Sequence, residues 1–144
     1  MKKITLATLC TIAAPVIVFS LFAQEISPRR PLYLHEQKKS VRSTQQHLST
    51  FTSTGDVILD FYADWCGPCN RMSPLIDSLA ATMPGFTFIK INRDFFLDLA
   101  NIFNITSIPT LIFLRNGQEI GRYDGKPLTK HELAQLIIRV YNNK

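Results

Sequence analysis

Trp65-Cys66-Gly67-Pro68-Cys69 is the stretch that decides the fold of this chain. It follows an apolar run over residues 57–63, broken only by Asp60, and it precedes a segment with apolar residues at helical spacing. The first cysteine is therefore expected at a helix N-terminus, where unpaired backbone N–H groups and the helix dipole stabilise an anion. We predict that Cys66 reacts as a thiolate nucleophile at neutral pH and that Cys69 lies close enough to form a disulfide with it.

Two other interpretations of the cysteine pair have to be weighed. A Cys-x-x-Cys motif can be half of a structural zinc site, which normally takes four protein ligands. The other candidate ligands are one cysteine and three histidines, namely Cys10, His35, His47 and His131. Cys10 lies in a predicted export segment and the histidines show no paired spacing, so we expect no metal. The pair can also form a purely structural disulfide, which the tight Gly67-Pro68 spacer and the flanking Trp65 argue against.

Further motifs follow the cysteine pair in a fixed order. They are Pro74, Ser107-Ile108-Pro109-Thr110, Asn116-Gly117 and Tyr123-Asp124-Gly125. Together with the stretch from Asp60 to Cys69, this ordered set resembles the thioredoxin family over about residues 30–144. The resemblance implies a thioredoxin fold and a thiol–disulfide oxidoreductase that needs no cofactor. The ordered set is far more specific than Cys-x-x-Cys alone.

The periodicity of the chain predicts an α/β fold. We expect a central mixed sheet with a parallel core, an antiparallel hairpin at its end and helices on both faces. The expected strands cover residues 32–34 (an edge strand), 57–63, 86–91, 110–114 and 119–123. The expected helices cover residues 36–51, 68–83 and 94–103, and a last one begins at Thr129 with a capping box to Glu132. In the helix over 94–103, the apolar residues Phe95, Phe96, Leu99, Ile102 and Phe103 are expected to pack inward.

The resemblance also implies roles for the catalytic residues. Cys66 attacks a partner disulfide, and Cys69, expected to be the more buried and less reactive thiol, resolves the mixed disulfide. Asp60 is a charge inside an apolar strand, and the resemblance places it beneath Cys69 as a base; a satisfied structural carboxylate is the alternative. Lys90 resembles the lysine that pairs with that aspartate, and a solvent-facing strand lysine is the alternative.

The predicted substrate-binding residues surround the cysteine pair. They are Trp65, Gly67, Pro68, Ile108, Pro109 and Gly125. The resemblance makes the Ile108–Pro109 bond cis, which would leave the backbone of Ile108 to pair with an extended substrate segment. Two residues depart from the family pattern. Tyr62 stands where many thioredoxins carry a tryptophan, and Asn70 stands where a lysine is common.

The N-terminus has the layout of an export signal. Lys2 and Lys3 precede an apolar stretch over residues 4–23, which is long enough to span a bilayer. We predict a signal peptide or signal anchor over 1–23, a linker over 24–31 and the thioredoxin-like domain over 32–144. We expect a periplasmic location, with residues 4–23 as an anchor to the inner membrane if the signal is not cleaved.

The formal net charge of the chain is +5, but its basic residues are scattered, so we expect no nucleic-acid partner. Our leading hypothesis is an exported, monomeric oxidoreductase that reduces the disulfides of other proteins. It would receive electrons from a membrane-embedded thiol carrier. A disulfide oxidase or isomerase of the same fold is the first alternative. A non-catalytic module that binds unfolded polypeptides is the second.

Overall fold

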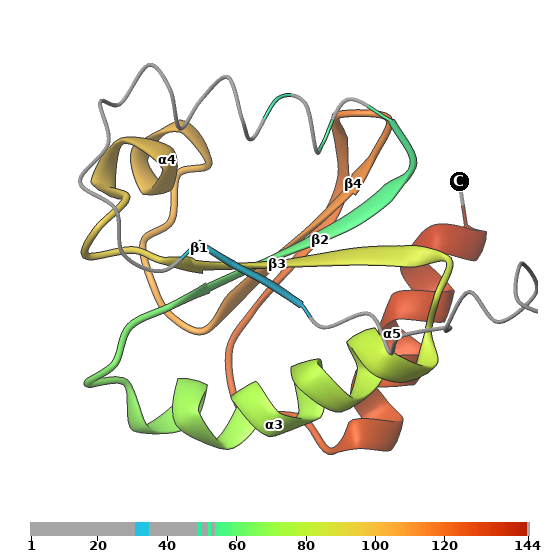
Figure 1. The fold of residues 1–144 in the computed structure, drawn as a ribbon, viewed down its shortest axis with the longest axis horizontal. Helices are drawn as coiled ribbons and strands as arrows, with labels where there is room; N and C mark the ends of the chain where they lie inside the picture. Colours follow the sequence, from blue (N-terminus) through green and yellow to red (C-terminus); the bar gives the residue numbers. More distant parts are fainter. Residues whose placement is uncertain (1–30, 35–48, 50–51, 53, 144) are drawn as a thin grey trace, which may run out of the picture.

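The computed structural model describes residues 31–34, 49, 52 and 54–143. A five-stranded sheet lies in the middle of the molecule, in the order β1-β3-β2-β4-β5 (Figure 1). The strands are β1 (Leu32–Leu34), β2 (Asp56–Tyr62), β3 (Phe86–Asn92), β4 (Thr110–Arg115) and β5 (Gln118–Asp124). The pairs β1–β3 and β2–β3 are parallel, and the pairs β2–β4 and β4–β5 are antiparallel. The predicted fold class, with a parallel core and an antiparallel hairpin, is confirmed.

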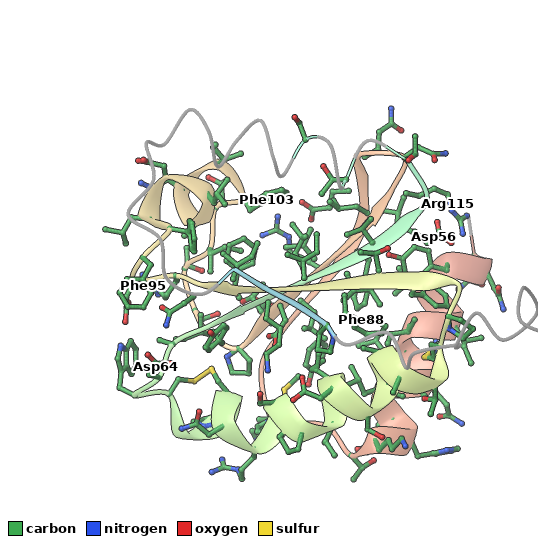
Figure 2. All side chains as sticks on the ribbon, viewed as in Figure 1. Asp56, Asp64, Phe88, Phe95, Phe103 and Arg115 are labelled. Atoms are coloured by element: carbon green, nitrogen blue, oxygen red, sulfur yellow. A yellow bond between two sulfur atoms is a disulfide. The ribbon has the colours of Figure 1, made fainter. Side chains whose placement is uncertain are left out.

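Helices cover both faces of the sheet. Helices α3 (Gly67–Thr82) and α5 (Lys130–Asn142) lie on one face, and α4 (Leu97–Ile102) lies on the other (Figure 1). Each face has its own apolar core. Phe88 packs on the α3 side of the sheet, whereas Phe103 packs on the α4 side (Figure 2).

The interior of strand β2 is apolar apart from Asp60, because the strand is covered on both faces. Val57, Leu59 and Phe61 point into the α4-side core, and Ile58 points into the α3-side core. Since successive side chains of a strand alternate between faces, Asp60 points with Ile58 toward α3. The single charge in the apolar run is thereby directed at the helix that carries the cysteines.

Helices α3 and α5 begin as the sequence predicts. Helix α3 starts on Cys66 as its N-cap and continues through Pro74. In α5, Thr129 accepts a hydrogen bond from the backbone of Glu132, and the Glu132 carboxylate accepts one from the backbone of Thr129. This capping box satisfies backbone donors that would otherwise be unpaired.

Helix α4 is shorter than predicted, and two of the residues that were expected to pack inward are exposed instead. The backbone N–H groups of Phe95 and Phe96 both donate to the carbonyl of Asn92, which makes a turn that delays the start of the helix. As a result, Phe95 is 61% exposed. Ile102 is also exposed, because at about 100° per residue it lies well off the buried face that runs through Ala100 and Phe103.

Strand β1 pairs only with β3 and is the edge strand that the sequence predicts. The predicted helix over residues 36–51 falls almost wholly outside the described residues, as do the segments 1–23 and 24–31. Within the described part of the chain, no helix is long and apolar enough to cross a membrane.

Candidate active site

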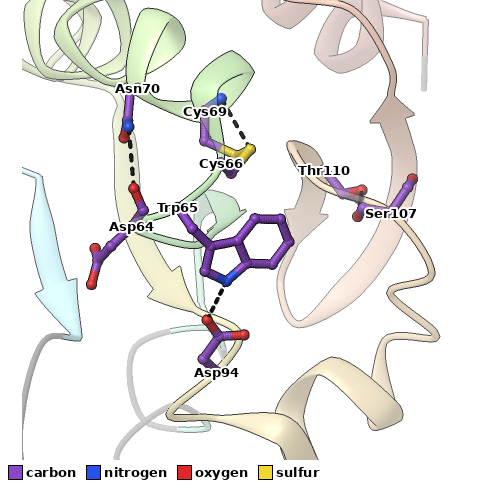
Figure 3. The surroundings of a disulfide bond; sticks show 8 residues. All are labelled: Asp64, Trp65, Cys66, Cys69, Asn70, Asp94, Ser107 and Thr110. Carbon is purple, nitrogen blue, oxygen red and sulfur yellow. Dashed lines mark hydrogen bonds between the residues drawn. A yellow bond between two sulfur atoms is a disulfide. The ribbon is translucent and has the colours of Figure 1, made fainter.

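The cysteine pair lies where β2 passes into α3. After β2 ends, the backbone N–H of Cys66 donates to the carbonyl of Ala63 at 3.1 Å, which turns the chain toward the helix. Cys66 and Cys69 form a disulfide, with their Cα atoms 5.2 Å apart. The backbone N–H of Cys69 donates to the Sγ of Cys66 at 3.2 Å (Figure 3). Pro68 fits the first turn because a helix does not use the N–H that proline lacks there.

Burial does not distinguish the two cysteines, which corrects the prediction that Cys69 is the more buried. Each is 4% exposed. The disulfide holds both sulfurs in one small cluster with Ala63, and Tyr62 and Ile108 pack against this cluster. The two residues differ instead in backbone position, because Cys66 caps the helix and Cys69 lies inside its first turn.

Asp60 and Lys90 are buried neighbours behind the disulfide. They stand opposite each other in the parallel register of β2 and β3, and they are 4% and 1% exposed. The solvent-facing alternative for Lys90 is therefore wrong. Burial raises the pKa of Asp60 from 3.8 to about 6, although the nearby positive charge of Lys90 lowers it and the charge of Asp77 raises it.

A cavity of about 470 Å³ connects this buried pair with Cys69. Its walls are Asp60, Tyr62, Asp64, Cys69, Asn70, Ser73 and Lys90. Both residues that depart from the family pattern line it. The ring of Tyr62 lies 5.5 Å from the Lys90 ammonium, and the side-chain amide of Asn70 donates to the carbonyl of Asp64 at 3.2 Å (Figure 3). The cavity therefore gives Asp60 and Cys69 a shared polar space.

Trp65 lies on the surface beside the disulfide. It is 70% exposed, so it is not a core residue. Its indole N–H donates to Oδ2 of Asp94 at 2.7 Å, and Figure 3 shows the ring between Cys66 and Asp94. This bond holds a large apolar ring in place at the surface beside the disulfide.

The loop before β4 supplies the other wall of the site. The Ile108–Pro109 peptide bond is cis, as the resemblance implies. Ile108 packs against the cysteine cluster, and Pro109 is buried. The hydroxyl of Thr110 donates to the carbonyl of Ser107 at 2.7 Å and closes the loop (Figure 3).

The other predicted substrate-binding residues lie at the rim. Gly125 is exposed and follows Asp124, which pairs with Thr110 across β4 and β5, so it sits at the level of Pro109. Gly67 is exposed and Pro68 is half-buried in the first turn of α3. The structure thus brings the cysteines, Ile108 and Pro109 together.

Sequence reasoning missed Ser73, Asp77 and Asp94. The ammonium of Lys90 donates to the hydroxyl of Ser73 and lies 3.5 Å from Oδ1 of Asp77. A signal for these two existed, because Cys69, Ser73 and Asp77 follow at four-residue spacing and share one helix face. Asp94 had no such signal, since it reaches Trp65 only through the fold. Within the described residues, no group of three or more His, Cys, Asp or Glu side chains is placed to hold a metal ion.

Breaking and re-forming the Cys66–Cys69 bond is the chemistry this arrangement allows, which makes the chain a thiol–disulfide oxidoreductase. The family model named Thioredoxin matches residues 37–139, and the chain belongs to the thioredoxin family.

Individual thioredoxins agree with this assignment. The thioredoxin of Mycoplasma genitalium is 39% identical over 104 residues, which cover 72% of this chain and 96% of that protein. The thioredoxin of Chlamydia pneumoniae is 39% identical over 82 residues, which cover 57% and 80%. Among solved structures, a mutant thioredoxin from Halobacterium salinarum superposes with a TM-score of 0.64 at 30% identity, covering 81% of this chain and 95% of its own. A thioredoxin from Nicotiana alata gives a TM-score of 0.64 at 31% identity, covering 80% and 96%.

Proposed function

We propose that this protein is exported and reduces disulfides in other proteins. The observation that carries the proposed exchange chemistry is the position of Cys66 at the start of α3, where its sulfur accepts a hydrogen bond from the backbone N–H of Cys69. The same donor and the helix dipole would stabilise the Cys66 thiolate in the reduced protein. Cys66 is therefore the nucleophile and Cys69 the resolving thiol.

The reaction has two exchange steps. The Cys66 thiolate attacks one sulfur of the partner disulfide, forms a mixed disulfide and expels the second partner sulfur as a thiolate. Cys69 then loses its proton and attacks the sulfur of Cys66, which expels the first partner sulfur. The partner gains two electrons and ends as a dithiol. This protein loses two electrons and ends with the Cys66–Cys69 disulfide.

Asp60 is the proposed base for the second step. Its pKa of about 6 leaves it mostly ionised at neutral pH, yet close enough to neutrality to accept a proton. The cavity that it shares with Cys69 gives the proton a polar route between the two side chains. Lys90, buried beside Asp60, lowers the pKa of the Asp60 carboxyl and so favours its ionised form.

We propose that the partner docks as an extended segment across the disulfide. Trp65 offers an exposed apolar ring on one side, and Ile108, Pro109 and Gly125 form the other side. A partner strand would pair with the backbone of Ile108, with Gly67 and Pro68 leaving room above the sulfurs. The substrates of this protein would be proteins whose cysteines must be reduced before haem is attached to them, or proteins with wrongly paired disulfides.

The location and the electron source complete the proposal. Lys2 and Lys3 with the apolar residues 4–23 support export to the periplasm, either as a cleaved signal or as a retained anchor. A reductase outside the cytoplasm needs a source of electrons, and a membrane-embedded thiol carrier would supply them to the Cys66–Cys69 disulfide. The exported protein would act as a monomer.

The reduction potential of the cysteine pair tests the direction of exchange. We would equilibrate the full chain, kept in solution by a mild detergent, in glutathione buffers and quantify the Cys66–Cys69 disulfide. A value of about −270 mV supports a reductase, whereas about −120 to −180 mV would favour the oxidase or isomerase alternative. Cys66→Ser should abolish turnover. Cys69→Ser should accumulate mixed disulfides with partners, which identifies them.

A fusion experiment tests export. The full chain would carry a C-terminal reporter enzyme that is active only outside the cytoplasm, with a chain lacking residues 1–23 as the matched control. Activity from the full chain alone supports export, and equal inactivity of both contradicts it. Extraction of the membranes at high pH then separates a released protein from one anchored by residues 4–23.

A further inference from the structure

Lys90 has two partners on the helix that carries the cysteines. Its ammonium donates a hydrogen bond to the hydroxyl of Ser73 and lies 3.5 Å from Oδ1 of Asp77. Ser73 and Asp77 are one helical turn apart on α3, on the face that also presents Cys69. The Lys90 side chain, which is 1% exposed, therefore extends from β3 to α3 across the floor of the cavity.

Two carboxylates compete for this one buried cation. Asp60 stands opposite Lys90 in the sheet and is 4% exposed, whereas the Asp77 side chain is 40% exposed. A buried ammonium is costly unless it is paired, so its position is decided by the partners that hold it. Any attraction toward Asp77 and Ser73 draws positive charge away from Asp60.

We propose that Ser73 and Asp77 are positioning residues that hold the Lys90 ammonium on the α3 side of the cavity, and that the charge of Asp77 thereby controls how readily Asp60 takes up a proton. This inference rests on the proposed role of Asp60 as the base for Cys69. It assigns to α3 two functions in the same reaction. The first turn of the helix carries the sulfurs, and the next two turns set the charge behind them.

The other groups around Lys90 do not replace Asp77 in this role. Tyr62 on β2 faces the ammonium with its ring, Asp64 lies at the cavity wall, and Cys69 is held in the disulfide. The pKa of Asp60 is raised first by burial and then, against the pull of Lys90, by the charge of Asp77.

The test measures the protonation of Asp60 directly. We would follow its carboxyl carbon by NMR against pH in the oxidised full chain, kept in a mild detergent. Asp77→Asn should lower the titration midpoint of Asp60 by about half a pH unit. It removes a nearby negative charge, and it lets the Lys90 ammonium interact more strongly with Asp60. Asp98→Asn is the matched control. It removes the same charge from an exposed position of α4, on the other face of the sheet, and should leave the midpoint unchanged.

Three further variants separate positioning from a general charge effect. Ser73→Ala should lower the midpoint as well, since it frees the ammonium to approach Asp60. Asp77→Glu keeps the charge and should restore the midpoint of the wild type. In a Lys90→Met background, Asp77→Asn should shift the midpoint by less than half as much. An Asp77→Asn midpoint equal to that of the wild type, or an undiminished shift without Lys90, would overturn the proposal.

Failure of this inference and failure of the proposed base are distinguishable. The pH profile of disulfide exchange would be compared between the wild type and Asp60→Asn. An unchanged profile would reject Asp60 as the base, whatever Asp77 does. A changed profile, together with an Asp60 titration midpoint that stays the same in Asp77→Asn and Ser73→Ala, would reject only the positioning role.

Discussion

Replacing Asp60 by asparagine should make the oxidised protein relatively more stable as the pH rises. The folded protein holds the Asp60 proton with a pKa of about 6, against an ordinary value of 3.8. Between these two pH values the folded state binds more protons than the unfolded state, so the free energy of unfolding of the wild type falls as pH increases. The asparagine side chain does not titrate, so the free energy of unfolding of the variant lacks this decrease with pH.

The size of the effect follows from the same two values. The interval from 3.8 to about 6, at about 1.4 kcal/mol for each pH unit, corresponds to about 3 kcal/mol. The stability of Asp60→Asn relative to the wild type should therefore increase by about 3 kcal/mol between pH 3 and pH 8. The increase should begin near pH 4 and level off above pH 6. All other carboxylates are common to both proteins and cancel in the difference.

Urea unfolding at a series of pH values measures this difference. Trp65, the only tryptophan of the chain, reports unfolding by its fluorescence, and both proteins would be kept oxidised. Asp98→Asn, which removes an exposed carboxylate, serves as the control and should show a difference that hardly depends on pH. A stability difference for Asp60→Asn that is flat with pH, or that decreases as pH rises, would refute the assignment of a raised pKa to this buried group.

Three further substitutions test contacts around the sheet and the site. Tyr141→Phe removes a buried hydroxyl that donates to the carbonyl of Val57 at 2.7 Å, and should lower the free energy of unfolding by about 1–2 kcal/mol in urea. Thr129→Ala breaks the capping box of α5 and should cost about 1 kcal/mol by the same assay. Asp94→Ala removes the acceptor of the Trp65 indole. It should lower the fluorescence anisotropy of that ring while changing stability by less than about 1 kcal/mol.

The parts of the fold that could be predicted are those in which local pattern and tertiary role agree. The interior of strand β2 is almost wholly apolar because helices cover both faces of the sheet there, so its composition already indicates a central strand. The helix after it could be placed because Cys66 and Pro68 suit an N-terminus and the apolar stripe follows at once. The predicted start of helix α4 was wrong because apolar spacing does not reveal the preceding turn, in which two backbone N–H groups donate to the carbonyl of Asn92.

The same division applies to the site. Cys66 and Cys69 are close in sequence, so their pairing is a local property. Asp60 stood out as a charge in an apolar strand. The environment of Lys90 could not be predicted in this way, because it depends on the register of β3 against β2 and on the path of α3 across the sheet. Ser73 and Asp77 lie on the face of α3 that carries Cys69, but only the fold shows that Lys90 reaches that face.

The replacement of the family's lysine by Asn70 increases the importance of Lys90. Where a lysine is common after the second cysteine, Asn70 presents a neutral amide that donates to the carbonyl of Asp64. Of the seven residues that line the cavity, Lys90 is therefore the only cation, and Asp60 has no second positive charge at the cavity wall to stabilise its ionised form. The proton affinity of the proposed base then depends on where a single ammonium is held. Because the contacts of that ammonium on α3 are made by Ser73 and Asp77, a change one or two turns from Cys69 can alter the chemistry of the disulfide without touching it.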